Sequence, residues 1–72
     1  MKVLIVDDDT EMAELLASVC DSDGHEATPC GSSKEATEHL ASHPVDLLIT
    51  DTGLSPQDAL AIEKQGTEVA RA

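Results

Sequence analysis

The sequence predicts an α/β fold with a parallel sheet, because strand-like and helix-like segments alternate along its 72 residues. Residues 2–6 and 45–50 are largely aliphatic and lack the polar alternation of a half-exposed strand, which is typical of strands covered on both faces. Between these two runs, apolar side chains recur at helical spacing. Strands and helices that alternate with right-handed crossovers form a parallel sheet with helices on both faces.

The first strand ends at Asp7, and a helix follows it. The apolar stripe of this helix recurs at i, i+3, i+4 and i+7. Its members are Met12, Leu15, Leu16 and Val19. Asp9 or Thr10 can accept hydrogen bonds from the first free amides, and Gly24 stands where a left-handed residue ends a helix.

The second unit repeats this order. Residues 25–30 predict a short strand that Pro29 confines to a sheet edge, since proline donates no ladder hydrogen bond. Residues 32–35 form a Ser-x-x-Glu capping box, and the helix that they begin ends before Pro44. Residues 45–50 are then the third strand.

The third helix is expected to have Ser55 as its N-cap and to run to about Gln65, with Gly66 ending it. Residues 67–72 are expected to be a frayed C-terminal tail, with a continuation of the helix as the alternative. The predicted domain therefore spans residues 1–66.

The two strongest apolar strands belong at the centre of the sheet, which predicts the strand order 2-1-3. This order places a switch point between strands 1 and 3, and ligands bind at the carboxyl ends of strands there. Asp7, Asp8 and Asp51 follow those two strands. Clustered carboxylates favour a hard cation such as Mg²⁺, beside which a carboxylate can attack a phosphoryl group. The alternative from spacing alone is that Asp7 and Asp8 only cap a helix and that Asp51 begins a loop.

The charge balance excludes several classes of partner. Four Lys and Arg residues against fifteen Asp and Glu residues give a net charge of −11, which is unsuited to nucleic acid or to an anionic membrane surface. No apolar run approaches the roughly 20 residues that span a bilayer, and no signal peptide is evident, so we expect a cytoplasmic protein. Because aromatic residues are absent, the core is small and we expect marginal stability.

Four segments carry a family resemblance that extends in register over residues 2 to about 62. They are Val3–Asp9, Gly24–Glu26, Ser32–Ala36 and Val45–Asp51. On these segments the sequence resembles the receiver domain of two-component response regulators. The resemblance implies a flavodoxin-like, three-layer fold that is truncated, because only three of the family's five βα units are present.

The resemblance also implies that Asp51 accepts a phosphoryl group in a phosphorelay. Asp7, Asp8 and Asp51 would hold Mg²⁺, together with the backbone carbonyl of Gly53. The donor would be the phosphohistidine of a sensor histidine kinase or of a histidine phosphotransfer protein. No catalytic residue beyond Asp51 is implied, and we do not expect an enzyme. A metal-dependent phosphatase of similar topology is disfavoured, because Gly53 stands where such an enzyme has a second aspartate.

Several departures from the family favour an alternative function. Ser55 occupies a position that is proline in the family, and Ala59 occupies a glycine position. The hydroxyl residue and the lysine that bind phosphoryl oxygens in the family belong to later strands. The alternative is a non-phosphorylated interaction module that dimerises or binds a kinase or regulator. Because truncation would leave apolar surface bare, we expect a homodimer through the exposed third-strand edge or the first helix.

Two minor patterns complete the list of candidate sites. His39 and His43 are spaced i, i+4 and could pair on a metal, with Glu35 as a further ligand, but a solvated helix face is the expected reading. Cys20 and Cys30 lack metal-type spacing and are expected to be small, buried or half-buried thiols.

Overall fold

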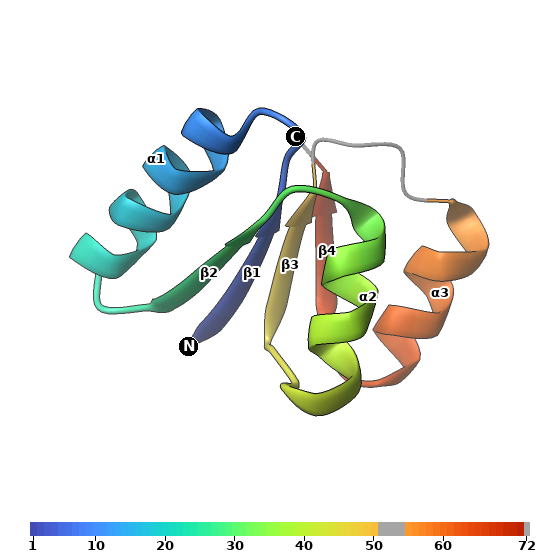
Figure 1. The fold of residues 1–72 in the computed structure, drawn as a ribbon. Helices are drawn as coiled ribbons and strands as arrows, with labels where there is room; N and C mark the ends of the chain where they lie inside the picture. The colour runs from blue at the N-terminus through green and yellow to red at the C-terminus, as the bar shows by residue number, and fades with distance from the viewer. Residues whose placement is uncertain (51–54, 72) are drawn as a thin grey trace.

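The computed structural model describes residues 1–50 and 55–71, which form one four-stranded sheet and three helices (Figure 1). The elements in chain order are β1 (Lys2–Val6), α1 (Thr10–Ser22), β2 (Glu26–Cys30), α2 (Ser33–Ser42), β3 (Leu47–Thr50), α3 (Pro56–Lys64) and β4 (Glu68–Arg71). All neighbouring strands are parallel, and their order is β2-β1-β3-β4. The order of the first three strands confirms the predicted 2-1-3 arrangement.

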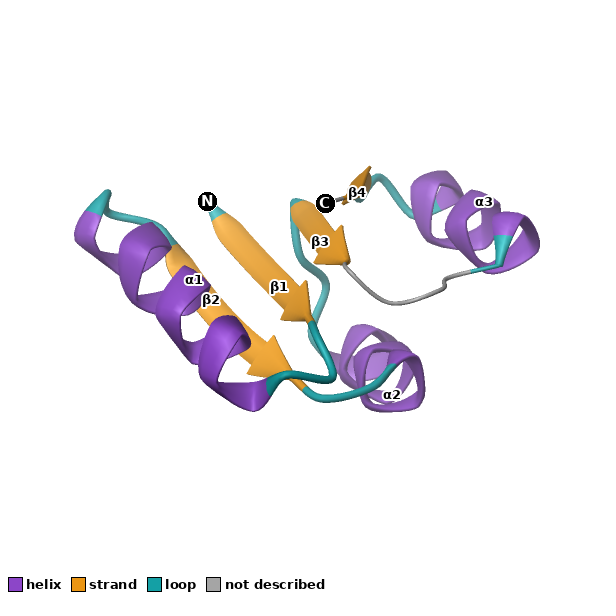
Figure 2. Cartoon of the chain, turned by 90° about the horizontal axis from the view of Figure 1, so that it is seen from above, coloured by secondary structure: helices purple, strands orange, loops and turns teal. Residues whose placement is uncertain are grey.

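The helices lie on both faces of the sheet, as the sequence predicts. Figure 2 shows α1 apart from α2 and α3, which lie side by side in Figure 1. The buried side chains form two separate clusters, one on each face. Leu4, Val6 and Leu48 pack with α2 and α3, whereas Val3 and Ile5 pack with α1. β1 is therefore buried on both faces, which accounts for its continuous aliphatic sequence.

Each helix begins at a side-chain cap that the sequence indicates. The carboxylate of Asp9 accepts hydrogen bonds from the amides of Glu11 and Met12 at 3.1 and 3.3 Å. The hydroxyls of Ser32 and Ser55 each accept a bond from the amide three residues on, at 3.2 and 3.1 Å. These bonds satisfy amides that have no partner within the helix.

The C-terminal segment departs from the prediction. The sequence predicts a frayed tail over residues 67–72 and a bare edge on β3. Both predictions are wrong for Glu68–Arg71, because this segment forms β4 and pairs with β3. Gly66, with φ of 93°, turns the chain after α3. The hydroxyl of Thr67, which is buried, then donates to the carbonyl of Val45 at 2.7 Å. β4 thus forms because β3 supplies its ladder partner.

One side of α1 remains apolar and exposed. Met12, Leu15 and Val19 are 43%, 58% and 54% exposed, whereas Ala13 and Ala17 pack on the sheet. The predicted apolar stripe is therefore only partly used within the chain. Among the described residues, no helix is both long and apolar enough to cross a membrane.

Replacing Leu48 by alanine is expected to destabilise the fold by about 2–5 kcal/mol, because the side chain is fully buried and its loss leaves a cavity. Urea unfolding measures the change. Leu60→Ala is the matched control, since Leu60 is 54% exposed, and its effect should be much smaller. Equal effects of the two substitutions would contradict this packing.

Replacing Thr67 by valine is expected to cost about 1–3 kcal/mol of unfolding free energy, because the buried carbonyl of Val45 loses its hydroxyl donor. The matched control is Thr37→Val, which removes a hydroxyl bond of 2.8 Å to a carbonyl in an exposed helix turn. Water can replace that bond. A loss at Thr67 no larger than the loss at Thr37 would argue against β4 as an integral strand.

Candidate functional site

The carboxyl ends of the strands meet at one edge of the sheet, where loops leave β1 and β2 and where β3 also ends (Figure 1). Val6, the last residue of β1, lies in register with Thr50, the last residue of β3. Asp7 therefore follows β1 directly beside the end of β3. This is the switch point that the strand order predicts, because α1 leaves one face of the sheet and α3 the other.

Asp7 is a buried carboxylate with a fixed orientation. Its side chain is 2% exposed, and its Oδ1 accepts a hydrogen bond of 2.9 Å from the amide of Asp9. Its own amide donates to the carbonyl of Cys30 at 3.0 Å. A buried carboxylate is costly unless it is hydrogen-bonded or paired with a cation, and the amide of Asp9 supplies one such hydrogen bond.

The three consecutive aspartates have different roles. Asp8 is exposed at the same edge of the sheet. Asp9 is exposed as well, but its Oδ1 caps α1. The structure thus confirms that Asp9 belongs to the start of the helix. Asp7 and Asp8 remain as the two carboxylates that directly follow β1 and are not used by a helix cap.

The other predicted members of the site, Asp51 and Gly53, lie outside the described residues. Within residues 1–50 and 55–71, no group of three or more His, Cys, Asp or Glu side chains is arranged to hold a metal ion. The carboxylates of Asp7 and Asp8 nevertheless fit Mg²⁺ chemically, because this cation prefers hard oxygen ligands and is bound through one or two carboxylates.

Cys30 is a contributor that sequence reasoning did not assign to the site. Its carbonyl holds the amide of Asp7, and its half-buried thiol lines a pocket of about 240 Å³ with Glu35 at the same edge. Burial raises the pKa of this thiol, and the nearby negative charge of Glu35 raises it further. The hydrogen bond to Asp7 uses the backbone carbonyl of Cys30, which any residue type could provide, so the sequence does not indicate this contact.

The predicted half-buried thiols are confirmed, because Cys20 and Cys30 are both free and half-buried.

Comparison with known protein families matches residues 3–69 to the response regulator receiver domain. The match covers nearly the whole chain, and the chain belongs to this family, whose members act in two-component signalling. A similar curated protein is the transcriptional regulatory protein PmrA of Pectobacterium parmentieri, which is 37% identical over 62 residues. The aligned region is 86% of this chain and 28% of the relative's length.

The thiol of Cys30 is expected to be alkylated slowly by iodoacetamide in the folded protein, since its raised pKa keeps it protonated at neutral pH. In a Cys20→Ser background, the midpoint of the pH–rate profile should lie above the ordinary thiol value of 9.0. The same protein in urea is the control. Replacing Glu35 by glutamine should lower the midpoint, because the repelling charge is removed.

The same shift has a consequence for stability. A thiol whose pKa is higher in the folded state stabilises the fold at pH values below the unfolded pKa, and this contribution is lost as the pH rises through the folded pKa. If the pH midpoint of the alkylation rate in the folded protein is equal to or below the midpoint measured in urea, the assigned environment of Cys30 is wrong.

Proposed function

We propose that this chain is a receiver module that accepts a phosphoryl group on Asp51 in a Mg²⁺-dependent step. The observation that carries the proposal is the buried, oriented carboxylate of Asp7 next to the end of β3, because Asp51 is the residue that follows β3 in the sequence. Family membership supports the same assignment, and the relative's match spans most of the chain.

The proposed step is a phosphoryl transfer between two side chains. The carboxylate of Asp51 attacks phosphorus, the bond from phosphorus to the donor's imidazole nitrogen breaks, and an aspartyl phosphate forms. The leaving imidazole takes up a proton. Asp7 and Asp8 would hold Mg²⁺ together with Asp51 and the carbonyl of Gly53, and the cation would neutralise charge on the phosphoryl oxygens.

Asp7, Asp8 and Asp9 have different roles in the proposed phosphoryl transfer. Asp7 keeps its orientation through the amide of Asp9 and through the carbonyl of Cys30, so the position of its carboxylate does not depend on the ligand. Asp8 is exposed and can change its rotamer as a cation enters. Asp9 is committed to the cap of α1 and thereby fixes the direction in which the loop leaves β1.

The partner in this proposal is a sensor histidine kinase or a histidine phosphotransfer protein, and the location is the cytoplasm. The module is not itself an enzyme in this scheme, because Asp51 takes up one phosphoryl group per chain and does not turn over a substrate. Its net charge of −11 is consistent with a protein partner and opposes contact with nucleic acid or anionic lipid.

The alternative proposal is a non-phosphorylated interaction module, and the exposed apolar stripe of α1 favours it. Met12, Leu15 and Val19 are each more than two-fifths exposed on one helix. An apolar patch of this kind is typical of a protein contact. Of the two dimer surfaces expected from the sequence, the edge of β3 is occupied by β4, so a homodimer would use α1.

The phosphorylation proposal is tested by incubation with a small acyl phosphate and Mg²⁺, followed by intact-mass measurement. We expect the mass of one added phosphoryl group, which disappears with a chelator and in Asp51→Asn. Asp7→Asn should lower the rate ~10-fold or more, because it removes a metal ligand. Asp58→Asn, at an exposed carboxylate in the first turn of α3, is the control and should behave like the parent.

Two results would overturn this function. An adduct that persists in Asp51→Asn would place the phosphoryl group elsewhere. Absence of any adduct, together with a dimer that is lost in Leu15→Ser, would establish the interaction module instead.

A further inference from the structure

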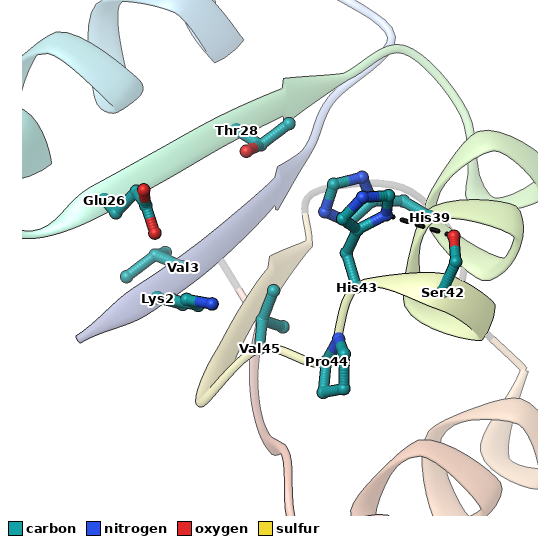
Figure 3. A pocket seen from close by; sticks show the side chains of 9 residues that line it. All are labelled: Lys2, Val3, Glu26, Thr28, His39, Ser42, His43, Pro44 and Val45. Carbon is teal, nitrogen blue, oxygen red and sulfur yellow. Dashed lines mark hydrogen bonds between the residues drawn. The ribbon is translucent and has the colours of Figure 1, made fainter.

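A pocket with a mixed polar and apolar lining lies opposite to Asp7, at the edge where β1 and β2 begin. It has a volume of about 350 Å³ and lies between the N-terminal ends of β1 and β2 and the last turn of α2 (Figure 3). The strands contribute Lys2, Glu26 and Thr28, and α2 with its C-cap contributes His39, Ser42 and His43. Neither the family assignment nor the proposed phosphoryl transfer uses these residues.

The two histidines form a pair. His39 and His43 are one helical turn apart, their rings are stacked with centroids 4.8 Å apart, and the angle between the ring planes is 21° (Figure 3). Both rings therefore lie on the same side of α2, over the pocket. Because the nitrogen lone pairs lie in the ring planes, the stacked rings point them side by side, and one ring has to turn about χ2 before both can bind the same ion. The spacing i, i+4 on a helix allows two imidazoles to bind one metal ion, as in helical His-x-x-x-His zinc sites.

The hydrogen bonding of His43 suits a metal ligand. Its Nδ1 lies 3.0 Å from the hydroxyl of Ser42. When Nδ1–H donates to this oxygen, the lone pair of Nε2 is available to a cation, which is the arrangement that orients metal-binding histidines in proteins. His39 is half-buried and His43 is exposed, so both rings can be reached by an ion from solvent.

We propose that His39 and His43 bind one transition-metal cation of the Zn²⁺, Ni²⁺ or Cu²⁺ class, with water at the remaining coordination positions. Imidazole suits these cations, whereas Mg²⁺ prefers carboxylate oxygen and water. No third described His, Cys, Asp or Glu side chain is placed to complete the site, so water or a small anion has to fill it. The proposal is independent of the phosphoryl transfer at the other edge.

The charges that face the pocket influence the expected affinity for the metal ion. Glu26 and Lys2 occupy paired positions on β2 and β1, and both are exposed. The carboxylate of Glu26 attracts a cation, and the ammonium of Lys2 repels it. Replacing Lys2 by glutamine should therefore tighten metal binding. A merely structural role of the histidine pair would not produce this response.

Binding would also be linked to helix stability. Metal binding requires the neutral form of both imidazoles, so protons compete with the metal ion. A cation held by two residues one turn apart braces the last turn of α2. The thermal midpoint should therefore rise with metal concentration.

The test is calorimetric titration of the full chain with Ni²⁺ in a Cys20→Ser, Cys30→Ser background. Excess Mg²⁺ in the buffer occupies the carboxylates at the other edge. We expect one Ni²⁺ per chain, a ~10-fold or greater loss of affinity in His39→Gln and in His43→Gln, and a gain in Lys2→Gln. Paramagnetic broadening of the Thr28 and Val45 amide signals in NMR spectra should locate the ion in the pocket.

The matched control is His25→Gln. The Nδ1 of His25 lies 3.1 Å from the N-terminal amine, which makes this pair the competing nitrogen site. Unchanged affinity in His25→Gln supports the proposal. Affinity that survives in the double variant of His39 and His43, or that disappears in His25→Gln, overturns it. Circular dichroism of each variant verifies that a loss of binding does not reflect unfolding.

Discussion

The burial of β1 on both faces is the constraint on which the rest of the structure depends. Val3 and Ile5 hold α1 to one face, and Leu4 and Val6 hold α2 and α3 to the other, with no side chain of the four more than 2% exposed. Burying such aliphatic side chains contributes roughly 1.5–3 kcal/mol each, which is the largest stabilising term available to a chain without aromatic residues. The burial of β1 also sets the position of Asp7. Asp7 is the residue that directly follows this strand, and its amide donates a hydrogen bond to the carbonyl of Cys30 at the end of β2.

The small core explains why polar contacts matter in this chain. Much of the helix packing against the sheet uses alanine, as at Ala13, Ala17 and Ala36, and alanine buries little area. Caps and single buried hydrogen bonds are therefore expected to contribute a larger share of the stability here than in a domain with a large core. The bond from Thr67 to Val45 is one of these, since it attaches β4 to the segment that leads into β3.

The two edges of the sheet present different donor chemistry. The carboxyl ends of the strands place acidic oxygens together, and such oxygens favour hard cations and phosphoryl groups. The opposite edge brings the C-terminal turn of α2 next to the starts of β1 and β2, and the donors there are imidazole nitrogens. Because hard and borderline cations prefer different ligands, the two proposed cation sites would not compete with each other.

The sequence by itself determined the alternation of elements, the 2-1-3 order of the first three strands, the helix caps and the acidic edge, because these depend on local periodicity and on residues next to strand ends. Only the tertiary structure shows that residues 68–71 form a strand. Glu68, Val69 and Ala70 have no strand pattern of their own, and they pair because β3 offers an open ladder. The spacing of His39 and His43 likewise predicts a shared helix face, but whether that face meets solvent or a pocket depends on how α2 packs against β1 and β2. That packing results from contacts between residues far apart in the chain, which no local pattern encodes.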